Sequence, residues 1–199
     1  MKKALVFDFG GVLMRTVDFG PRRSWEMTLG LPEWGLSKLV FENHVASKAT
    51  VGVAQTADVW GFVAAELRLS EAELDKLQRD FWAGDCVDTV LTDFVGQQRG
   101  KCRTAILSNA WPGARQFFHS LPDLSVFENL VISAEEGVAK PAMEIYRRTL
   151  ERVGVAAAQT MFVDDMEENV VAARSLGMAG VVFENTEQTL TALHQWLSG

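Results

Sequence analysis

Side chains able to hold a metal ion or an anion occur at four places along this 199-residue chain. Three of the groups follow short apolar runs that are typical of buried strands, and the fourth is a lysine just ahead of a helical pattern. In open parallel sheets, ligands bind beyond the carboxyl ends of the strands, so we expect these side chains to meet at one edge of a sheet. The groups are Asp8 with Gly10 and Gly11 behind it, Ser108 with Asn109, Lys140, and Asp164 with Asp165.

Each group taken alone also has an ordinary structural explanation. A carboxylate followed by two glycines is common in strand-to-loop turns. Ser108 and Asn109 could cap the helix that follows them, and Asp164 and Asp165 could offset the dipole of the next helix. Lys140 by itself would be a solvated surface lysine. The functional interpretation therefore depends on the combination of the four groups.

The combination predicts a site for a divalent cation and a phosphoryl group. Asp8, Asp164 and Asp165 would repel one another at one sheet edge, and their burial is costly unless a cation is present. Oxygen ligands without a nearby histidine or cysteine favour magnesium over zinc, and such a magnesium ion completes its shell with water and substrate phosphate. Lys140 and the Ser108 hydroxyl could then bind the remaining phosphate oxygens.

Five short apolar runs are the predicted strands that position these residues. Their nearly continuous apolar character indicates strands that are covered on both faces. Helical patterns separate the later runs, and one of them is opened by Pro141 and closed by Gly154. Strands that alternate with helices predict an α/β fold with a doubly wound, mostly parallel, Rossmann-like sheet. The runs span residues 4–9, 104–107, 130–133, 160–163 and 180–183.

Residues 16–100 break this alternation, because they contain helix signals in series and no convincing buried strand. Ser70 and Glu73 have the spacing of a capping box at the start of one helix, and residues 87–94 carry an apolar stripe at helical spacing. The sequence therefore predicts a helical domain inserted after the first strand. The predicted division is an α/β core domain over 1–15 and 101–199 and a helical domain over 16–100.

The composition limits the partners and the location of the protein. Hydrophobic residues make up 48% and charged residues 23%, with a formal net charge of −7. The acidic balance argues against nucleic acid and anionic membranes, because both need a dense basic face. No apolar run approaches a membrane span, and Asp8 interrupts the first run before a signal peptide could form. With only two cysteines, we expect a cytoplasmic protein without a disulfide framework, either a monomer or a homodimer.

The four groups resemble, in order, the four motifs of the haloacid dehalogenase superfamily. Asp8 is similar to the nucleophile of the first motif, and Ser108 matches the second. Lys140 before a proline resembles the third motif, and Asp164 with Asp165 resembles the fourth. The resemblance covers the whole chain, because the helical segment lies where this superfamily inserts its small helical (C1-type) cap.

The resemblance implies a mechanism and a set of roles. Asp8 would attack phosphorus and form an aspartyl-phosphate, which water then hydrolyses, with Ser108 and Lys140 as the other catalytic residues. The implied cofactor is Mg²⁺, and the implied substrate is a small phosphorylated metabolite. The implied metal ligands are Asp8, the backbone carbonyl of Gly10, Asp165, and Asp164 directly or through water. The implied phosphate-binding residues are Ser108, Asn109, Lys140, Gly10 and Gly11.

The chain departs from the superfamily pattern at Gly10. Most phosphatases of the superfamily carry a second aspartate there, which protonates the leaving group and later activates water. General acid–base assistance is commonly worth about 10²- to 10⁴-fold in rate. The backbone carbonyl at this position remains available to a metal ion.

Three functions are compatible with this departure. The chain could be a phosphatase acting on a sugar-phosphate-like substrate whose leaving group needs little protonation. It could be a non-catalytic phosphoryl-ligand-binding or regulatory protein. A 2-haloacid dehalogenase is least favoured, because such enzymes use no metal and resemble Ser-Ser-Asn where this chain has Asp164 and Asp165. A phosphomutase would lack the group that activates an acceptor hydroxyl. We expect a phosphatase, since a discarded site would have lost some of these residues.

Two further residues are candidates for substrate specificity. Arg15 lies just beyond the first motif and could meet a second anionic group of the substrate. Trp111 directly follows Ser108 and Asn109 at a predicted strand end and could shape the rim of the pocket. The physiological substrate itself is not encoded in any motif of the sequence.

Overall fold

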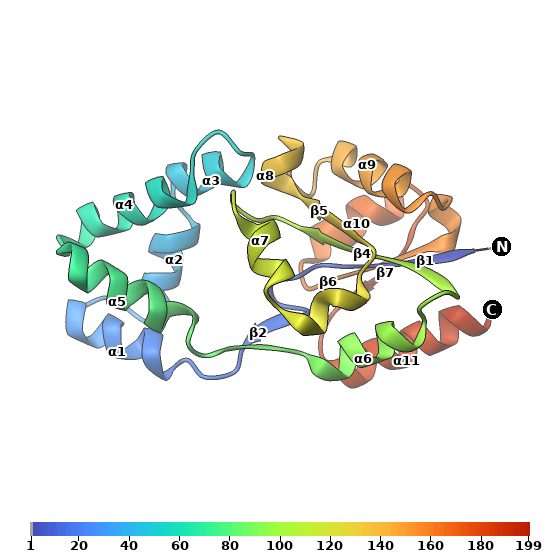
Figure 1. The fold of residues 1–199 in the computed structure, drawn as a ribbon, viewed down its shortest axis with the longest axis horizontal. Coiled ribbons are helices and arrows are strands. Elements are labelled where there is room, and N and C mark those ends of the chain that lie inside the picture. The colour runs from blue at the N-terminus through green and yellow to red at the C-terminus, as the bar shows by residue number, and fades with distance from the viewer. Residues whose placement is uncertain (1) are drawn as a thin grey trace.

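A computed structural model describes residues 2–199, and its centre is a five-stranded parallel sheet (Figure 1). The strand order is β5-β4-β1-β6-β7, so the first strand of the chain lies in the middle of the sheet. Each of the five predicted runs is a strand, with ends displaced by at most two residues. The strands are β1 (Lys3–Phe7), β4 (Cys102–Ser108), β5 (Asn129–Ile132), β6 (Thr160–Asp164) and β7 (Ala179–Val182).

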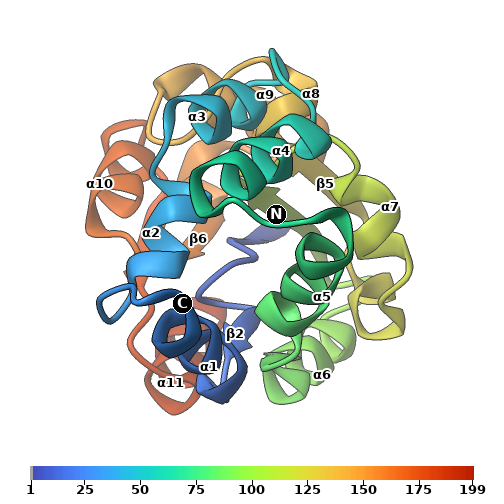
Figure 2. The same cartoon turned by 90° about the vertical axis from the view of Figure 1, so that its left-hand side faces the viewer.

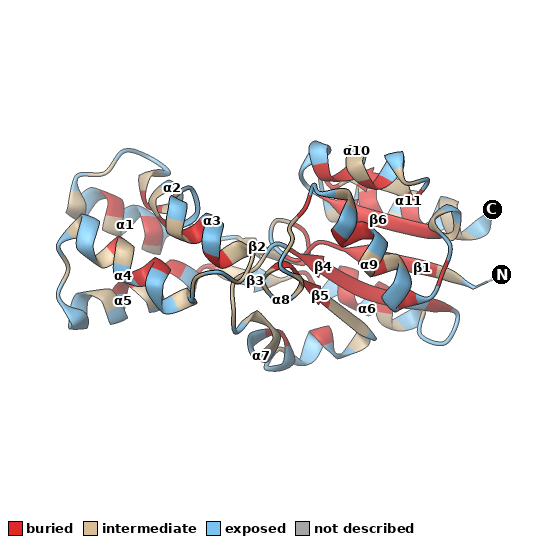
Figure 3. Ribbon diagram, turned by 90° about the horizontal axis from the view of Figure 1, so that it is seen from above, coloured by how far each residue is buried: buried red, intermediate tan, exposed pale blue. Residues whose placement is uncertain are grey.

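Helices cover both faces of the sheet, which confirms the predicted doubly wound α/β fold. Side chains of β1 alternate between the two faces: Leu5 and Phe7 pack towards α6 and α11, and Ala4 and Val6 towards α9 and α10. Figure 3 shows the buried strands between helices whose outer faces are exposed. Within residues 2–199, no helix is long and apolar enough to cross a membrane. The helices of this domain are α6 (Thr89–Gln97), α7 (Ala114–His119), α8 (Ser133–Glu136), α9 (Met143–Val153), α10 (Glu167–Ser175) and α11 (Thr186–Ser198), with 3-10 turns η1 (Pro122–Val126) and η2 (Ala157–Gln159).

Five of the helices between β1 and β4 form a cap, which Figure 2 shows from its outer side. The cap has its own apolar core. Leu36, Val63 and Phe81 lie at the centre of that core and are fully buried. The predicted capping box is present, because the Ser70 amide donates to the Glu73 carboxylate at 2.8 Å and the Glu73 amide donates to Ser70 Oγ at 3.4 Å. The cap helices are α1 (Gly20–Leu29), α2 (Gly35–Phe41), α3 (His44–Thr50), α4 (Thr56–Leu67) and α5 (Glu71–Trp82).

Two short strands that the sequence analysis missed connect the cap to the sheet domain. They are β2 (Met14–Thr16) and β3 (Asp85–Val87), and they pair antiparallel, so that the outgoing and returning chains run side by side. Strands of three residues are too short to show an alternating pattern. Just beyond them, the Val17 amide donates to the Gly84 carbonyl at 2.9 Å, and a Cβ on Gly84 would overlap the Asp18 carbonyl. Only glycine fits at this crossing.

Helix α6 lies in the sheet domain, whereas the sequence predicts it as part of the cap. Leu91 and Phe94 are buried in the same apolar cluster as β1, and α6 packs against α11 and η1. The apolar stripe over residues 87–94 shows that one helix face is buried, but periodicity does not specify the domain against which it packs. The insert therefore ends at β3, well before residue 100, and the paired strands β2 and β3 form the hinge between the cap and the sheet domain.

Candidate active site

The four groups of polar residues meet at the carboxyl edge of the sheet. Asp8 directly follows β1, Ser108 ends β4 and Asp164 ends β6. These three strands are parallel neighbours, so their ends lie side by side. Lys140 reaches the same place from the loop between α8 and α9, and all four residues are buried. The sheet topology thus brings together the residues that the sequence predicted to converge.

Lys140 is the centre of a buried ion-pair network. Its Nζ lies 2.7 Å from Asp8 Oδ1 and 2.6 Å from Asp164 Oδ2, and its side chain is 1% exposed. Asn109 holds the Lys140 backbone from both sides, because its Nδ2 donates to the carbonyl at 3.0 Å and its Oδ1 accepts from the amide at 2.9 Å. The Lys140–Pro141 peptide bond is cis and α9 begins at Met143, so Pro141 precedes the helix instead of occupying its first position.

Asp164 differs from the other two carboxylates because both of its oxygens have protein donors. Oδ2 contacts Lys140, and Oδ1 accepts from the Met166 amide at 2.8 Å and from Asn169 Nδ2 at 2.9 Å. Asp164 is fully buried, whereas the neighbouring Asp165 is exposed and lines a cavity. Asp164 is thereby placed to hold Lys140 and the start of α10.

The three carboxylates fit a hard divalent cation. Asp8, Asp164 and Asp165 each offer an oxygen, and these atoms lie within 4.8 Å of one another. Desolvation raises the pKa of Asp8 to about 6 against the attraction of Lys140, and repulsion from Asp164 adds to the rise. Partial desolvation at the cavity wall and the same repulsion raise the pKa of Asp165. The raised pKa values show that the ionised carboxylates are disfavoured at this site, and a cation would offset that cost; oxygen donors of this kind suit magnesium.

Glycine occupies positions 10 and 11 in two different structural environments. Gly11 has a φ of 80°, and a Cβ on it would overlap the Asp165 carboxylate, so glycine lets Asp165 approach this loop. A Cβ added to Gly10 would meet no atom within 4 Å, and Gly10 lines the cavity. The position where most phosphatases of the superfamily carry an acid is therefore open space beside Asp8.

A cavity of about 1110 Å³ lies between the cap and these residues. Arg15 and Trp111 line it, as do the predicted site residues Asp8, Ser108, Lys140 and Asp165. The Arg15 guanidinium, however, already contacts a protein carboxylate, since its Nη2 lies 2.7 Å from Asp88 Oδ2. Gly10, Gly11 and Asn109 also line the cavity, and Asp164 lies behind it against Lys140.

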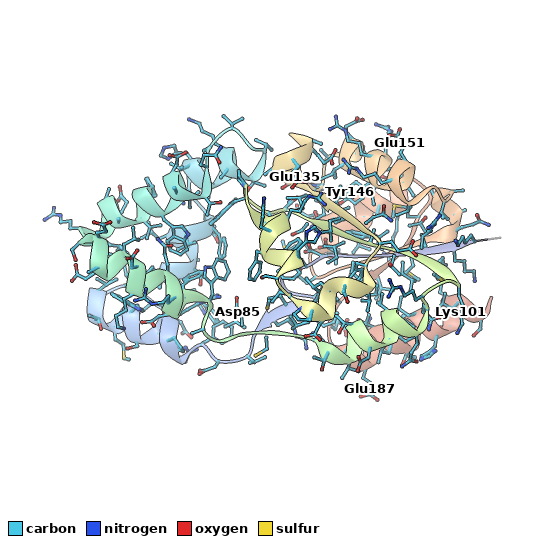
Figure 4. The ribbon with its side chains drawn as sticks, in the orientation of Figure 1. Asp85, Lys101, Glu135, Tyr146, Glu151 and Glu187 are labelled. Atoms are coloured by element: carbon cyan, nitrogen blue, oxygen red, sulfur yellow. The ribbon has the colours of Figure 1, made fainter. Side chains whose placement is uncertain are left out.

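An ion pair at the hinge also lines the cavity. Asp85 lies where the chain returns from the cap (Figure 4), and its Oδ1 is 2.9 Å from Arg22 Nη2. The Arg22 Nε donates to the Phe81 carbonyl at 2.7 Å, which ties α1 to the end of α5. Both side chains are about nine-tenths buried, so the pair is shielded from water.

Aromatic side chains form much of the cavity wall, and Trp111 alone among them is a site candidate from the sequence. A helical stripe predicts that an aromatic residue is buried, but it does not predict whether the residue faces a core or a cavity between domains. The only hint in the sequence is the large number of Trp and Phe residues, 6 and 12. The aromatic residues of the wall are Phe9, Phe19, Phe41, Trp60, Trp82, Trp111, Phe117 and Phe118.

Comparison with known proteins gives similarities that extend over the whole chain. Sesquiterpene phosphatase astK of Aspergillus oryzae is 25% identical over 201 residues, which cover 97% of this chain and 95% of that protein. A predicted HAD-like family hydrolase from Porphyromonas gingivalis has a TM-score of 0.79 at 20% identity, covering 100% of this chain and 99% of that one. A HAD family enzyme from Bacteroides thetaiotaomicron, in complex with magnesium and inorganic phosphate, has a TM-score of 0.70 at 20% identity and covers 91% and 93%.

The match to a protein family covers most of the chain and includes all four motifs. The family is described as haloacid dehalogenase-like hydrolase, and its model matches residues 2–177. That range contains Asp8, Ser108, Lys140 and the two late aspartates. The chain therefore belongs to the haloacid dehalogenase-like hydrolases, as the resemblance of its motifs predicts.

Proposed function

We propose that this hydrolase is a magnesium-dependent phosphatase that acts on a small phosphorylated metabolite through an aspartyl-phosphate on Asp8. The observation that carries the proposal is the buried network in which Lys140 contacts both Asp8 and Asp164 beside an open cavity. Support comes from the phosphatase activity named for the Aspergillus relative and from the magnesium and phosphate bound by the Bacteroides enzyme.

Asp8 is oriented as a nucleophile by contacts to one of its two oxygens. Oδ1 accepts from the Phe9 amide at 2.7 Å and contacts Lys140, and Oδ2 makes neither bond. We assign Oδ2 to the attack on phosphorus. Lys140 keeps Asp8 in place. Together with the Ser108 hydroxyl and the backbone amide of Asn109, it binds the oxygens of the phosphoryl group.

The magnesium ligands in this proposal are Asp8, Asp165 and the backbone carbonyl of Gly10. Asp164 was also predicted as a ligand; because its oxygens have protein donors, we assign it to holding Lys140. When bound, magnesium supplies the positive charge that lets the carboxylates and a phosphate dianion occupy one site. Because no acid occupies position 10, the proton that the leaving group takes must come from water or from another residue of this chain.

The test is magnesium-dependent phosphate release from glucose 1-phosphate, a nucleoside monophosphate, acetyl phosphate and p-nitrophenyl phosphate. We expect turnover that requires magnesium and falls by about 10³-fold or more in Asp8→Asn, because the nucleophile is removed. The matched control is Asp75→Asn on the exposed side of α5, which should retain the wild-type rate. The panel also tests the sequence prediction of a sugar-phosphate-like substrate.

Other outcomes would contradict the proposal. Equal rates in wild type and Asp8→Asn would mean that Asp8 is not the nucleophile. No turnover of any substrate by a folded protein that binds magnesium would favour a phosphoryl-ligand-binding or regulatory role. Chloride release from 2-chloropropionate without magnesium would favour a dehalogenase.

A further inference from the structure

The cavity beside Asp8 exposes large apolar side chains of a kind that globular proteins normally bury. Phe41 and Trp82 of the cap are each 45% exposed, Phe117 of α7 is 49% exposed, and Met166 is 50% exposed. All four line this one cavity, together with Trp111, whose ring centroid is 5.7 Å from that of Phe41. A cluster of exposed apolar side chains in a concave site is typical of a surface that binds an apolar ligand.

The threonine side chains that the cap and hinge contribute to the cavity already donate to protein partners. Thr16 Oγ1 donates to Asp85 at 2.6 Å, Thr50 Oγ1 to the Ala46 carbonyl at 2.9 Å, and Thr56 Oγ1 to the Pro112 carbonyl at 2.7 Å. A site that selects a sugar needs donors and acceptors free for several hydroxyl groups. These threonines do not offer free donors of that kind.

The cations that line the cavity are also paired. Lys140 contacts two carboxylates, Arg15 pairs with Asp88, and Arg22 pairs with Asp85. Within residues 2–199, these three are the Lys and Arg side chains of the cavity wall. A second anionic group on a substrate would have to displace a protein carboxylate, which disfavours diphosphates and substrates with an additional carboxylate.

From these observations we propose that the substrate is the monophosphate ester of an uncharged, largely apolar alcohol. Its phosphate lies at Asp8, and its apolar part lies among Phe41, Trp82, Trp111 and Phe117. The inference rests on the proposed phosphatase function and adds the chemical class of the leaving group. From the sequence, Arg15 is expected to contact a second anionic group of the substrate. In the structure it pairs with Asp88 instead, so the proposed substrate has no second anionic group.

The reaction balances without a further reactant other than water. The bond between Asp8 Oδ2 and phosphorus forms as the bond from phosphorus to the alcohol oxygen breaks. The alcohol oxygen keeps that electron pair and takes a proton from water, which leaves hydroxide. A second water molecule then attacks phosphorus and breaks the bond to Oδ2, whose oxygen keeps the electron pair. This releases phosphate and restores Asp8, and the proton lost by the second water molecule neutralises the hydroxide. The apolar wall binds the part of the substrate that does not react.

The decisive measurement is the affinity of alkylphosphonates of increasing length, which are not hydrolysed. Titration calorimetry with magnesium present compares ethyl-, butyl- and hexylphosphonate, each below its critical micelle concentration. We expect the affinity to rise about fourfold for each methylene group that becomes buried. Affinities of ethyl- and hexylphosphonate within about threefold of each other would overturn the inference.

Variants locate the apolar part of the ligand. Phe41→Ala and Phe117→Ala should each weaken hexylphosphonate about tenfold and weaken ethylphosphonate less, because the shorter chain has less apolar surface to bury. Both side chains are about half exposed, and neither belongs to the buried residues of the two cores. Phe41→Leu should retain most of the affinity. The matched control is Phe62→Ala, since Phe62 packs against His44 in the cap and is not part of the cavity wall.

A charged analogue tests the part of the inference that concerns the paired cations. 6-Phosphonohexanoate adds a carboxylate at the far end of the chain and should bind about tenfold more weakly than hexylphosphonate. Tighter binding of this analogue would overturn the assignment of an uncharged leaving group, because it would mean that Arg15 or Arg22 accepts a substrate anion.

Failure of this inference is distinguishable from failure of the proposed function. Asp8-dependent hydrolysis of p-nitrophenyl phosphate without any dependence of affinity on chain length would overturn the apolar substrate and keep the phosphatase. Chain-length-dependent binding without hydrolysis of hexyl phosphate or any other phosphate ester would overturn the phosphatase and keep the apolar site.

Discussion

Gly10 is the residue at which the chemistry of this site is easiest to change. A Cβ added there meets no atom within 4 Å, and the position borders the cavity next to Asp8. An acid at this position would protonate the leaving group, which matters most for an alcohol that leaves poorly. The open space therefore allows the missing acid to be restored without rebuilding the loop.

We predict that Gly10→Asp raises kcat for hexyl phosphate at least about tenfold, which is the low end of the usual contribution of general acid–base catalysis. The rate with p-nitrophenyl phosphate should change little, because its leaving group needs little protonation. Steady-state kinetics on both substrates provide the measurement, and Gly10→Asn is the control of equal size that cannot act as an acid. An equal gain in Gly10→Asn would show that size, not proton transfer, is responsible.

Asp8 makes the stability of the metal-free protein depend on pH. Its pKa is about 6 in the folded state, above the ordinary value of 3.8 that holds in the unfolded chain, so the folded state binds the proton more tightly. Stability therefore falls as the pH rises from about 4 to about 6, by up to about 3 kcal/mol at 1.36 kcal/mol per pKa unit.

The test is urea unfolding of wild type and Asp8→Asn between pH 4.5 and pH 7 in the presence of a chelator. We expect the free energy of unfolding of Asp8→Asn to rise relative to wild type as the pH increases, because only wild type must ionise Asp8. Magnesium should reduce this difference by stabilising the ionised form. A difference that is constant across the pH range would contradict the assignment of the raised pKa to Asp8.

Among the elements, helix ends with polar caps were predictable because their signals are local. Asn185 caps α11, and its Oδ1 accepts from the Gln188 amide at 2.9 Å. Ser70 and Glu73 cap α5 in the same way. The strands β2 and β3 were missed, because three-residue strands are defined by their partner and not by their own sequence.

We predict that Asn185→Ala lowers the free energy of unfolding by about 1 kcal/mol, because an amide at the start of α11 loses its acceptor. Urea denaturation of the sheet domain, monitored by circular dichroism, measures the change. Asn185→Asp is the control, since it keeps an acceptor and adds a favourable charge at the helix start. An equal loss in Asn185→Asp would rule out capping as the cause.

At the scale of the whole molecule, the cap touches the sheet domain away from the hinge as well. Thr56 Oγ1 donates to the Pro112 carbonyl at 2.7 Å, and α3 packs against α8. Gly52, with a φ of 75°, lies so close to the Ala134 carbonyl that a Cβ on it would overlap this oxygen. These contacts hold the cap over the cavity.

We predict that Gly52→Ala loosens the contact between cap and sheet domain. Hydrogen exchange of the α3 and α8 backbone amides should become about tenfold faster, and the affinity for hexylphosphonate should fall, because the cavity walls separate. Gly30→Ala is the control, since Gly30 has a φ of 65° and a Cβ there meets no atom within 4 Å. If both variants exchange equally fast, backbone strain and not the clash is responsible.

Local patterns in the sequence predict the parallel sheet, the alternation of strands and helices outside the cap, and the meeting of Asp8, Ser108, Lys140 and Asp164 at one edge. These features follow from local patterns, because an apolar run forms a strand and the ends of parallel strands share an edge. The tertiary structure alone decided that α6 covers the sheet, that Arg15 pairs with Asp88, and that aromatic rings line the cavity. Each of these depends on which distant segment a side chain packs against, and the period of a helix specifies only that one face is buried.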